Sequence, residues 1–425
     1  MSLPFGLRLY RAGTHLAGWI VPPLLKDRVR KGKEDPERLC ERQGLSALAR
    51  PEGRLIWIHG ASVGESLISL CLIHELKARH PNAFILCTSG TRTSAHLLSQ
   101  RLPEGSAHHY VPIDRLDWAK AFVDHWQPDL AIFVESELWP NLIIETARTG
   151  AAMALVNARM NEGSLKSWRA WHDSANWLLG CFDWIGPADQ RTAEGLSKLL
   201  GQDIAVAGNL KLDAPAAPAP ANLVEDMRTL VGDRPLWLAA STHEGEEALV
   251  LNAHKQLLST DPNALLILAP RHPERAQPIS DLITKAGLSY AQRSKKQDPD
   301  AQTQVWLVDT LGEMGFWFAL APAALMGGSL VDGIGGHNPV EATKAGAKVA
   351  TGPFTASFTD IYAAYIKTKG AVITKDSEAI AAFVRQVWAG DGPSLDHARQ
   401  ALKIASGGAL ETTLNALDRL IPEEA

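Results

Sequence analysis

From Arg54 onward, short apolar runs alternate with segments of helical periodicity, and this alternation constrains the fold more than any other feature of the chain. Strands buried on both faces read as continuous apolar runs, and crossover helices between such strands give a parallel sheet. In the first half we expect strands at residues 55–59, 83–88, 130–134, 152–156 and 184–186. The helices expected between them span residues 66–79, 93–101, 116–125, 140–149 and 191–200.

Residues 213–222, with the sequence DAPAAPAPAN, interrupt this pattern. Proline removes a backbone donor and restricts its neighbours, so we expect a semi-rigid linker. The alternation then resumes, with strands expected at residues 236–240, 264–269, 305–308, 323–326, 348–350 and 371–374. Residues 395–420 are predicted to be helical, and this last helix is a candidate to pack back on the first domain.

A chain of 425 residues exceeds one ordinary hydrophobic core, so two domains are the expectation. The sequence therefore predicts an α/β protein with two Rossmann-like domains, residues 46–212 and residues 223–425, whose parallel sheets face an interdomain cleft. In open sheets of this kind, ligands bind beyond the carboxyl ends of the strands.

Residues 1–45 form a third, distinct segment. Up to Gln43 it holds nine Lys and Arg against five Asp and Glu, a charge of +4 in a chain whose net charge is −5. Arg8, Arg11 and three prolines make it too polar for a membrane-spanning helix, and it has no small-residue cleavage site. We expect a helix lying in the membrane surface, or alternatively an arm packed on the protein. The apolar side of that helix would present Leu7, Tyr10, His15, Trp19 and Ile20.

The overall composition excludes several classes of protein. The acidic net charge does not favour nucleic-acid binding. The four cysteines form no CxxC pair, so neither a disulfide framework nor a zinc site is predicted, and a reducing cytoplasm fits best. The oligomeric state is not defined by the sequence.

Two motifs of the first half follow predicted strands. HGASVGES, residues 59–66, has the glycines of a tight turn but is not the GxGxxG dinucleotide fingerprint. Its Glu65 is either a general base or an acid favoured by the dipole of the following helix. In VESELWPN, residues 134–141, Glu135 and Glu137 project to the same side while the chain stays extended. The alternative for these two carboxylates is a structural role, with one capping backbone amides and the other solvated.

Three motifs of the second half predict a phosphate-binding region. In STHEGEE, residues 241–247, Ser241 or Thr242 can cap a helix beginning near Glu244, leaving amides for a phosphate. In APRHPER, residues 269–275, Arg271 and His272 can add positive charge. The run GGSLVDGIGGHNPVEA, residues 327–342, contains five glycines before a predicted helix start, which favours close approach of backbone to a ligand.

Taken together, the segments GASVGE, ESELWPN, RHPER and GGHNPVEA resemble one family in their order and spacing. That family is the 3-deoxy-D-manno-octulosonic acid (Kdo) transferases of lipid A and lipopolysaccharide core assembly, which are GT-B glycosyltransferases. NAR, residues 157–159, and DTLGEMG, residues 309–315, also resemble family segments, and the resemblance covers residues 55–353.

The resemblance implies a reaction and a set of site residues. Kdo would pass from CMP-Kdo to a lipid A precursor, lipid IVA, in a single inverting displacement with Glu65 as the base and Glu135 and Glu137 as an acidic pair. No metal or cofactor is implied, and the enzyme would act at the cytoplasmic face of the inner membrane. The acceptor would contact Ser62, Gly64 and Arg159. The donor would contact Ser241, Thr242, Arg271, His272, Gly312, Glu313, Gly328, Ser329, His337, Asn338 and Glu341.

The chain departs from the family pattern at three places. MNEGSLKSW follows NAR where a Ser-Glu-Arg-like run is usual, and Ala342 replaces a proline. Ala356 and Ser357 stand where a His/Asn pair is expected, which leaves open a variant sugar. The rival interpretations are a GT-B enzyme using a UDP-sugar, a catalytically idle scaffold and, third, a dehydrogenase.

Overall fold

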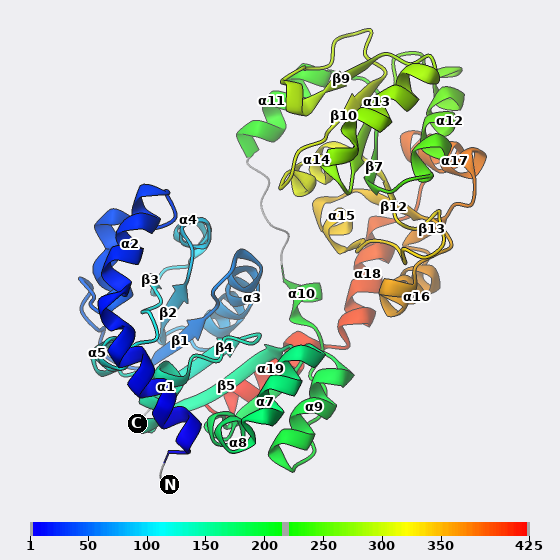
Figure 1. Cartoon of the computed structure of the whole chain (residues 1–425). Coiled ribbons are helices and arrows are strands. Elements are labelled where there is room, and N and C mark those ends of the chain that lie inside the picture. Colours follow the sequence, from blue (N-terminus) through cyan, green and yellow to red (C-terminus); the bar gives the residue numbers. More distant parts are fainter. Residues whose placement is uncertain (1–2, 215–220, 423–425) are drawn as a thin grey trace. The chain divides into compact units, whose positions relative to one another are not determined.

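The computed structural model describes residues 3–214 and 221–422. The chain divides into two compact units, shown in Figure 1. The first unit comprises Met1–Pro215 and Ser406–Ala425, and the second comprises Ala216–Ala405. Each unit is a parallel sheet with helices on both faces, which confirms the predicted α/β class.

The sheet of the first unit has, within the described residues, six parallel strands in the order β3-β2-β1-β4-β5-β6. The direction of strand order reverses between β1 and β4, and this topological switch point is where ligands bind in such sheets. The five predicted strands are confirmed, whereas β3 was missed because its sequence, SAHHY, has no apolar run. The strands are β1 (Leu55–His59), β2 (Phe84–Ser89), β3 (Ser106–Tyr110), β4 (Leu130–Val134), β5 (Ala152–Ala158) and β6 (Trp184–Pro187).

Two hydrophobic clusters lie on the two faces of this sheet. Successive side chains of a strand point to opposite faces, so Trp57 packs in one cluster while Ile56 and Ile58 pack in the other. The covering helices are α3 (Val63–Arg79), α4 (Arg92–Arg101), α5 (Leu116–Trp126), α6 (Pro140–Arg148), α7 (Glu162–Ala170), α8 (His172–Leu179), α9 (Gln190–Leu200), α10 (Leu210–Asp213) and α19 (Ala409–Asp418).

The N-terminal segment folds as α1 (Phe5–Leu16) and α2 (Val21–Arg30), drawn in blue in Figure 1. The membrane-facing side predicted for α1 is partly wrong. Leu7 is buried, and Tyr10 donates a hydrogen bond of 2.9 Å to Asp114 on the protein, so these two residues anchor the helix. The arm is thus packed on the first unit. Trp19 and Ile20 are exposed as predicted, and they belong to a larger set of exposed apolar side chains. That set is Phe5, Leu9, Leu16, Trp19, Ile20 and Leu24. Among the described residues no helix is long and apolar enough to cross a membrane.

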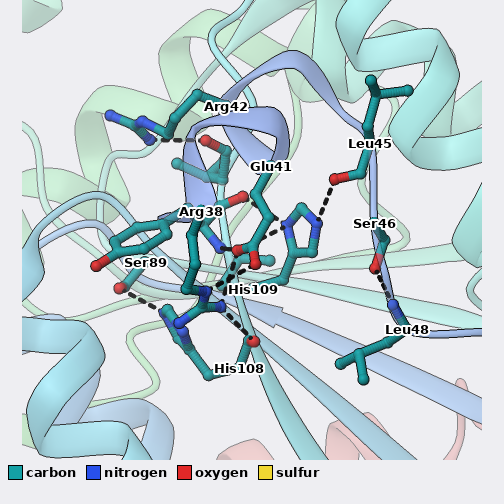
Figure 2. A network of polar contacts seen from close by, with 12 residues as sticks. Arg38, Glu41, Arg42, Leu45, Ser46, Leu48, Ser89, His108 and His109 are labelled. Atoms are coloured by element: carbon teal, nitrogen blue, oxygen red, sulfur yellow. Dashed lines mark hydrogen bonds and ion pairs between the residues drawn. The ribbon is translucent and has the colours of Figure 1, made fainter. Parts of the chain in front are cut away.

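A kinked 3₁₀ segment, Pro36–Gln43, covers the free edge of β3, and Figure 2 shows the contacts. Glu41 accepts a hydrogen bond from the backbone N–H of Tyr110 at 2.7 Å, and Arg38 donates one to the carbonyl oxygen of His108 at 2.9 Å. Arg38 and Glu41 also pair with each other at 2.7 Å. These side chains replace a neighbouring strand, so the edge does not expose a row of unpaired backbone groups.

The half-buried His108 of this edge makes stability depend on pH. Burial lowers the pKa of His108 to about 3, whereas an unfolded histidine has a pKa of about 6.5. Between these values the unfolded chain binds a proton that the folded chain does not, so stability falls as pH drops from about 6.5 towards 3. We expect His108→Gln to flatten the decline of the unfolding temperature between pH 7 and pH 4, measured by calorimetry. The exposed His172, replaced by Gln, is the control, and equal slopes for the two variants would contradict this account.

The second unit has a sheet of seven parallel strands in its described residues, in the order β13-β12-β11-β7-β8-β10-β9. Its switch point lies between β7 and β11. All six predicted strands are present, and the short β9 was not predicted. The strands are β7 (Leu236–Thr242), β8 (Leu265–Pro270), β9 (Tyr290–Gln292), β10 (Val305–Leu307), β11 (Ala323–Met326), β12 (Lys348–Thr351) and β13 (Ala371–Ile373). The helices are α11 (Ala221–Val231), α12 (Glu246–Leu258), α13 (Ala276–Lys285), α14 (Met314–Leu320), α15 (Val340–Ala345), α16 (Thr359–Thr368), α17 (Ser377–Trp388) and α18 (Leu395–Ser406).

Two expectations about the segment boundaries need correction. The helix predicted over 395–420 is broken into α18 and α19 by Gly407 and Gly408, which both have left-handed φ values, +65° and +75°. The last helix was a candidate to pack back on the first domain, and residues 406–425 belong to the first unit, where Asp418 accepts a hydrogen bond of 2.6 Å from Arg79. Of the predicted linker 213–222, residues 215–220 lie outside the described residues, and α10 and α11 extend into its two ends.

Candidate active site

The turn after β1 places Glu65 at the switch point of the first unit. Ser62 is the N-cap of α3, and Glu65 is the third residue of the helix. A Cβ atom on Gly60 would lie 3.0 Å from the Cβ of Glu65 and 3.0 Å from the Oγ of Ser69, so only glycine lets the turn pass this closely.

The Glu65 carboxylate closes a capping box. Its Oε2 accepts a hydrogen bond from the Ala61 N–H at 2.7 Å, and its Oε1 accepts one from the Ser62 hydroxyl at 2.6 Å. The Ser62 Oγ in turn accepts the Glu65 N–H at 3.4 Å. Glu65 therefore acts as the acid at the start of helix α3, and the capping box fixes the position of its side chain.

The environment of Glu65 also favours its neutral form. Burial raises the pKa of its carboxyl group, and the negative charges of Glu137 and Glu135 raise it further, although Ser62 and Ala61 act in the opposite direction. A carboxylate with a raised pKa is a stronger base than a solvated one, and this is how enzymes prepare a general base.

Glu135 and Glu137 follow β4, which is the strand next to β1. Glu135 has a left-handed φ of +63° and forms an ion pair of 2.6 Å with Lys211 of α10. Glu137 accepts a hydrogen bond of 2.7 Å from the Trp139 indole and lies 3.8 Å from the buried His59 ring. Burial acts to raise the pKa of Glu137, but His59 and Trp139 lower it overall. Both carboxylates are half-buried and have side-chain partners, Lys211 for Glu135 and His59 with Trp139 for Glu137.

The three residues predicted to contact the acceptor lie at the same sheet edge. Ser62 and Gly64 lie at the start of α3, and a Cβ on Gly64 would make ordinary contacts with Ser62 at 3.9 Å and Lys211 at 4.0 Å. Arg159 follows β5, and its carbonyl oxygen accepts a hydrogen bond from the Ser136 hydroxyl. The Nε of Arg159 is buried without a hydrogen-bond partner in the described part of the chain. An unpaired buried donor is uncommon in a folded protein and therefore distinguishes Arg159 from its neighbours.

In the second unit, Ser241 and Thr242 end β7 rather than capping a helix. Helix α12 begins at Glu246 with Gly245 as its N-cap and no side-chain cap, so the predicted capping role of Ser241 or Thr242 is wrong. Ser241 has a left-handed φ of +56°, and the Thr242 hydroxyl is buried without a hydrogen-bond partner among the described residues. Gly327, after β11, passes so close that a Cβ would lie 2.6 Å from the Ser241 carbonyl oxygen.

The fully buried Glu246 holds the loop after β11. Its carboxylate accepts hydrogen bonds from the N–H groups of Gly328, Ser329 and Leu330 at 2.7–2.9 Å, and from the His243 N–H at 2.9 Å. The Ser329 hydroxyl is also engaged, with the Met326 carbonyl oxygen and the Gly352 N–H. The amides of this loop are thus occupied by a side chain of the protein itself.

Three histidines and an arginine lie at the carboxyl end of this sheet. The Nε2 atoms of His243 and His337 are 2.9 Å apart with their rings stacked, and the His272 ring lies 5.6 Å from the His243 ring. Burial, with the nearby His243 and Arg271, lowers the pKa of His337 to about 4, so its ring is neutral at pH 7. The pKa of His243 is also lowered by burial. An anion bound here would stabilise the protonated rings.

The remaining predicted donor residues differ in their surroundings. Glu313 pairs with Arg293 at 3.1 Å and accepts a hydrogen bond from Thr310, and although burial opposes it, these partners lower its pKa. Gly312, two residues before α14, has a φ of +84°. The Asn338 side chain accepts the Val340 N–H at 3.1 Å, and Glu341 is exposed in the first turn of α15.

Several residues of these sites were not singled out from the sequence. Lys211 lies far from Glu135 in the chain and no local pattern marks it. His243 and Glu246 lie inside the STHEGEE motif, so their residue types alone could have identified both as candidate site residues. No group of three His, Cys, Asp or Glu in the described ranges is arranged to hold a metal ion. That no metal or cofactor is needed stays a prediction.

Removing the Glu246 carboxylate tests its importance for the second unit. In Glu246→Ala the buried N–H groups of Gly328, Ser329 and Leu330 lose their acceptor, at about 1 kcal/mol or more each. We expect the free energy of unfolding of this unit to fall by at least about 3 kcal/mol, measured by urea titration with hydrogen exchange of its peptides. The exposed Glu244, replaced by Ala, should change it by less than about 0.5 kcal/mol. Equal effects of the two substitutions would rule out this role.

Comparisons with known proteins agree with the family that the sequence motifs resemble. The family described as "3-Deoxy-D-manno-octulosonic-acid transferase (kdotransferase)" matches residues 37–214. The chain is 34% identical over 349 residues to the 3-deoxy-D-manno-octulosonic acid transferase of Rickettsia bellii, covering 82% of this chain and 83% of that protein.

Among the solved structures that resemble most of this chain, two illustrate the fold. One is UDP-GlcNAc 2-epimerase from Neisseria meningitidis bound to UDP-GlcNAc, with a TM-score of 0.53, 14% identity, and coverage of 86% of this chain and 100% of that chain. The other is a glycosyltransferase from Rickettsia africae, with a TM-score of 0.52, 13% identity, and coverage of 88% and 100%. At these identities the matches show the fold alone, and they confirm the predicted GT-B class.

Proposed function

Since the chain belongs to the family of 3-deoxy-D-manno-octulosonic acid transferases, we propose that it transfers Kdo from CMP-Kdo to lipid IVA, a lipid A precursor, and releases CMP. The acceptor would bind in the first unit and the donor in the second. The observation that carries this proposal is the buried Glu65 at the β1/β4 switch point, whose pKa is raised by burial and by Glu137 and Glu135.

In the proposed step, Glu65 takes the proton of a glucosamine hydroxyl of the acceptor. The oxygen attacks the anomeric carbon of Kdo as the bond from that carbon to the CMP phosphate oxygen breaks. The electron pair leaves with CMP, and configuration is inverted in a single displacement. The acceptor hydroxyl would replace the Ser62 hydroxyl as a partner of Glu65, which supports the assignment of Ser62 to acceptor binding.

The departing phosphate would be met by Arg271, which is exposed, and by His243, His272 and His337. Because burial lowers the pKa of His243 and His337, an incoming anion would favour protonation of these two rings and gain charge-assisted hydrogen bonds. Stabilisation of charge that develops on the leaving group is worth several kcal/mol in enzymes of many kinds, on the order of 3 for one donor.

The exposed apolar residues of α1 and α2 support peripheral association with the cytoplasmic face of the inner membrane. Leu16 and Trp19 are 72% and 77% exposed, and the cations Lys26, Arg30 and Lys31 follow them in the chain. Apolar side chains beside cations are the features of a surface that binds anionic lipid.

The transfer is tested with purified protein, freshly generated CMP-Kdo and a tetra-acylated lipid A precursor, followed by product mass. We expect Kdo increments with the wild type and a loss of about 10²-fold or more in kcat with Glu65→Gln. Glutamine still completes a capping box, so this variant should fold, whereas Ser62→Ala tests the cap and should cost about 1 kcal/mol. No transfer by a folded wild type that binds CMP would point to another acceptor or sugar.

Two further readouts belong to this experiment. Glu137→Gln removes a charge that raises the pKa of Glu65, so the acid limb of the kcat profile should move to lower pH. A purely structural Glu137 would leave that limb in place. Thermal stabilisation by CMP but not UMP separates Kdo transfer from the use of a UDP-sugar, and absence of CMP binding would refute the assignment.

Membrane association is tested by sedimentation with anionic vesicles. We expect the Leu16→Glu/Trp19→Glu variant to bind vesicles about tenfold or more weakly than the wild type, because it places negative charge among the apolar side chains that would enter the membrane surface. Raising the salt concentration should weaken binding of the wild type, since the cations contribute. Leu282→Glu, at an exposed position of the second unit, is the matched control. Equal sedimentation of all three proteins would contradict the proposed surface.

A further inference from the structure

Helix α7 separates two depressions on the first unit, and the proposed catalytic step uses neither. One is an apolar groove of about 530 Å³ that α7 and α8 form with α1 and the start of α6. The other is a polar cleft of about 320 Å³ between α7 and α9. Both volumes lie within the usual range for small-molecule sites or at its lower end.

The groove exposes aromatic side chains, and helix α1 packs tightly against one of them. Trp171 is 54% exposed and Trp139 is 40% exposed, and Trp168 lies beside them in the lining. Gly6 of α1 packs so tightly here that a Cβ atom would lie 2.8 Å from the Trp171 ring and 2.5 Å from the Ser174 Oγ. Several large apolar side chains exposed side by side usually indicate a binding site.

The groove lies next to the acidic cluster of the candidate active site. Trp139, which lines the groove, donates its indole hydrogen bond to Glu137 at 2.7 Å. Glu137 in turn raises the pKa of Glu65. A molecule in the groove is therefore one side chain away from the carboxylates that would act on the acceptor.

The cleft on the other side of α7 is cationic. Its lining holds two acids, Glu162 and Glu194, against four cations, so its net charge is +2. Within residues 3–214 these cations form no ion pair. Leu165 and Gly195 close its floor, where a Cβ on the glycine would lie 2.5 Å from the leucine. The four cations are Lys166, Arg169, Arg191 and Lys198.

We propose that α7 is the recognition element for the acceptor, with one acyl chain in the Trp-lined groove and a phosphate group in the cationic cleft. This inference rests on the proposed function and assigns it two subsites. The charge of the cleft complements a phosphate, and guanidinium groups suit phosphate oxygens. A bilayer would meet the protruding side chains of α1 and α2, whereas a concave groove beside a cationic cleft fits a single amphiphile that carries both chemistries.

The test compares acceptors that differ in one chemistry, in detergent micelles where no bilayer is present. The acceptors are a tetra-acylated bisphosphorylated glucosamine disaccharide, its acyl-free counterpart and its monophosphorylated counterpart. We expect Trp171→Ala to raise KM about tenfold for the acylated acceptor with kcat within twofold, and to leave kcat/KM for the acyl-free acceptor unchanged. Lys166→Gln/Arg169→Gln should raise KM about tenfold for the bisphosphorylated acceptor and less for the monophosphorylated one.

Leu230→Ala, an exposed leucine of the second unit, is the matched control for loss of apolar surface. Equal losses of Trp171→Ala on acylated and acyl-free acceptors would overturn the groove assignment, and equal losses of the double variant on both phosphorylation states would overturn the cleft.

Direct binding keeps this inference separate from the reaction. An acceptor analogue with brominated acyl chains should quench tryptophan fluorescence of the wild type, and Trp168→Phe/Trp171→Phe should lose most of that quenching. Quenching without transfer would support the groove and refute the proposed function. Absence of quenching, in a protein that still transfers Kdo, would refute the groove alone.

Discussion

Both units place a glutamate in the first turn of the helix that follows the first strand of the sheet, and backbone N–H groups hold its carboxylate. In the first unit this is Glu65, which accepts hydrogen bonds from the turn after β1. In the second unit it is Glu246, which accepts them from the turn after β7 and from the loop after β11. A parallel sheet ends all its strands at one edge, so a carboxylate at this position lies at the switch point and orders the loops around it.

The number of partners decides what each carboxylate can do. Glu246 is fully buried, and four N–H groups leave it no free role beyond fixing the loop that carries Gly328 and Ser329. Glu65 has a hydroxyl among its partners, and a hydroxyl can be exchanged for that of a substrate. It also has Glu135 and Glu137 as like-charged neighbours, whose charges raise its pKa. The same local structure therefore gives a structural acid in one unit and a candidate base in the other.

The sequence predicted those features that depend on local pattern. Continuous apolar runs identified 11 strands, because strands buried on both faces carry that pattern whatever their neighbours are. The prediction failed for β3, because this strand is covered through contacts of His108 and His109 with Arg38 and Glu41 from a distant segment. The motifs located Glu65, Glu135 and Glu137, but not Lys211, which reaches Glu135 only through the fold. The predicted capping role of Ser241 is wrong because strand β7 continues through Thr242 and helix α12 begins only at Glu246. The Glu246 carboxylate accepts hydrogen bonds from the loop after β11.

The N-terminal helix illustrates the same limit and connects the surface to the proposed chemistry. The sequence pattern correctly predicted an amphipathic helix but assigned Leu7 and Tyr10 to its outer side. The pattern does not show that the Tyr10 hydroxyl donates a hydrogen bond to Asp114, which is distant in the sequence. Those two residues face the protein and, together with Leu9 of the same helix, line the groove that contains Trp171. The contacts that anchor the arm therefore also create the apolar wall beside Trp139 and Glu137. An amphiphile held against that wall would lie beside Trp139, whose indole donates to Glu137, so the packing of the first helix shapes the surface next to the candidate site.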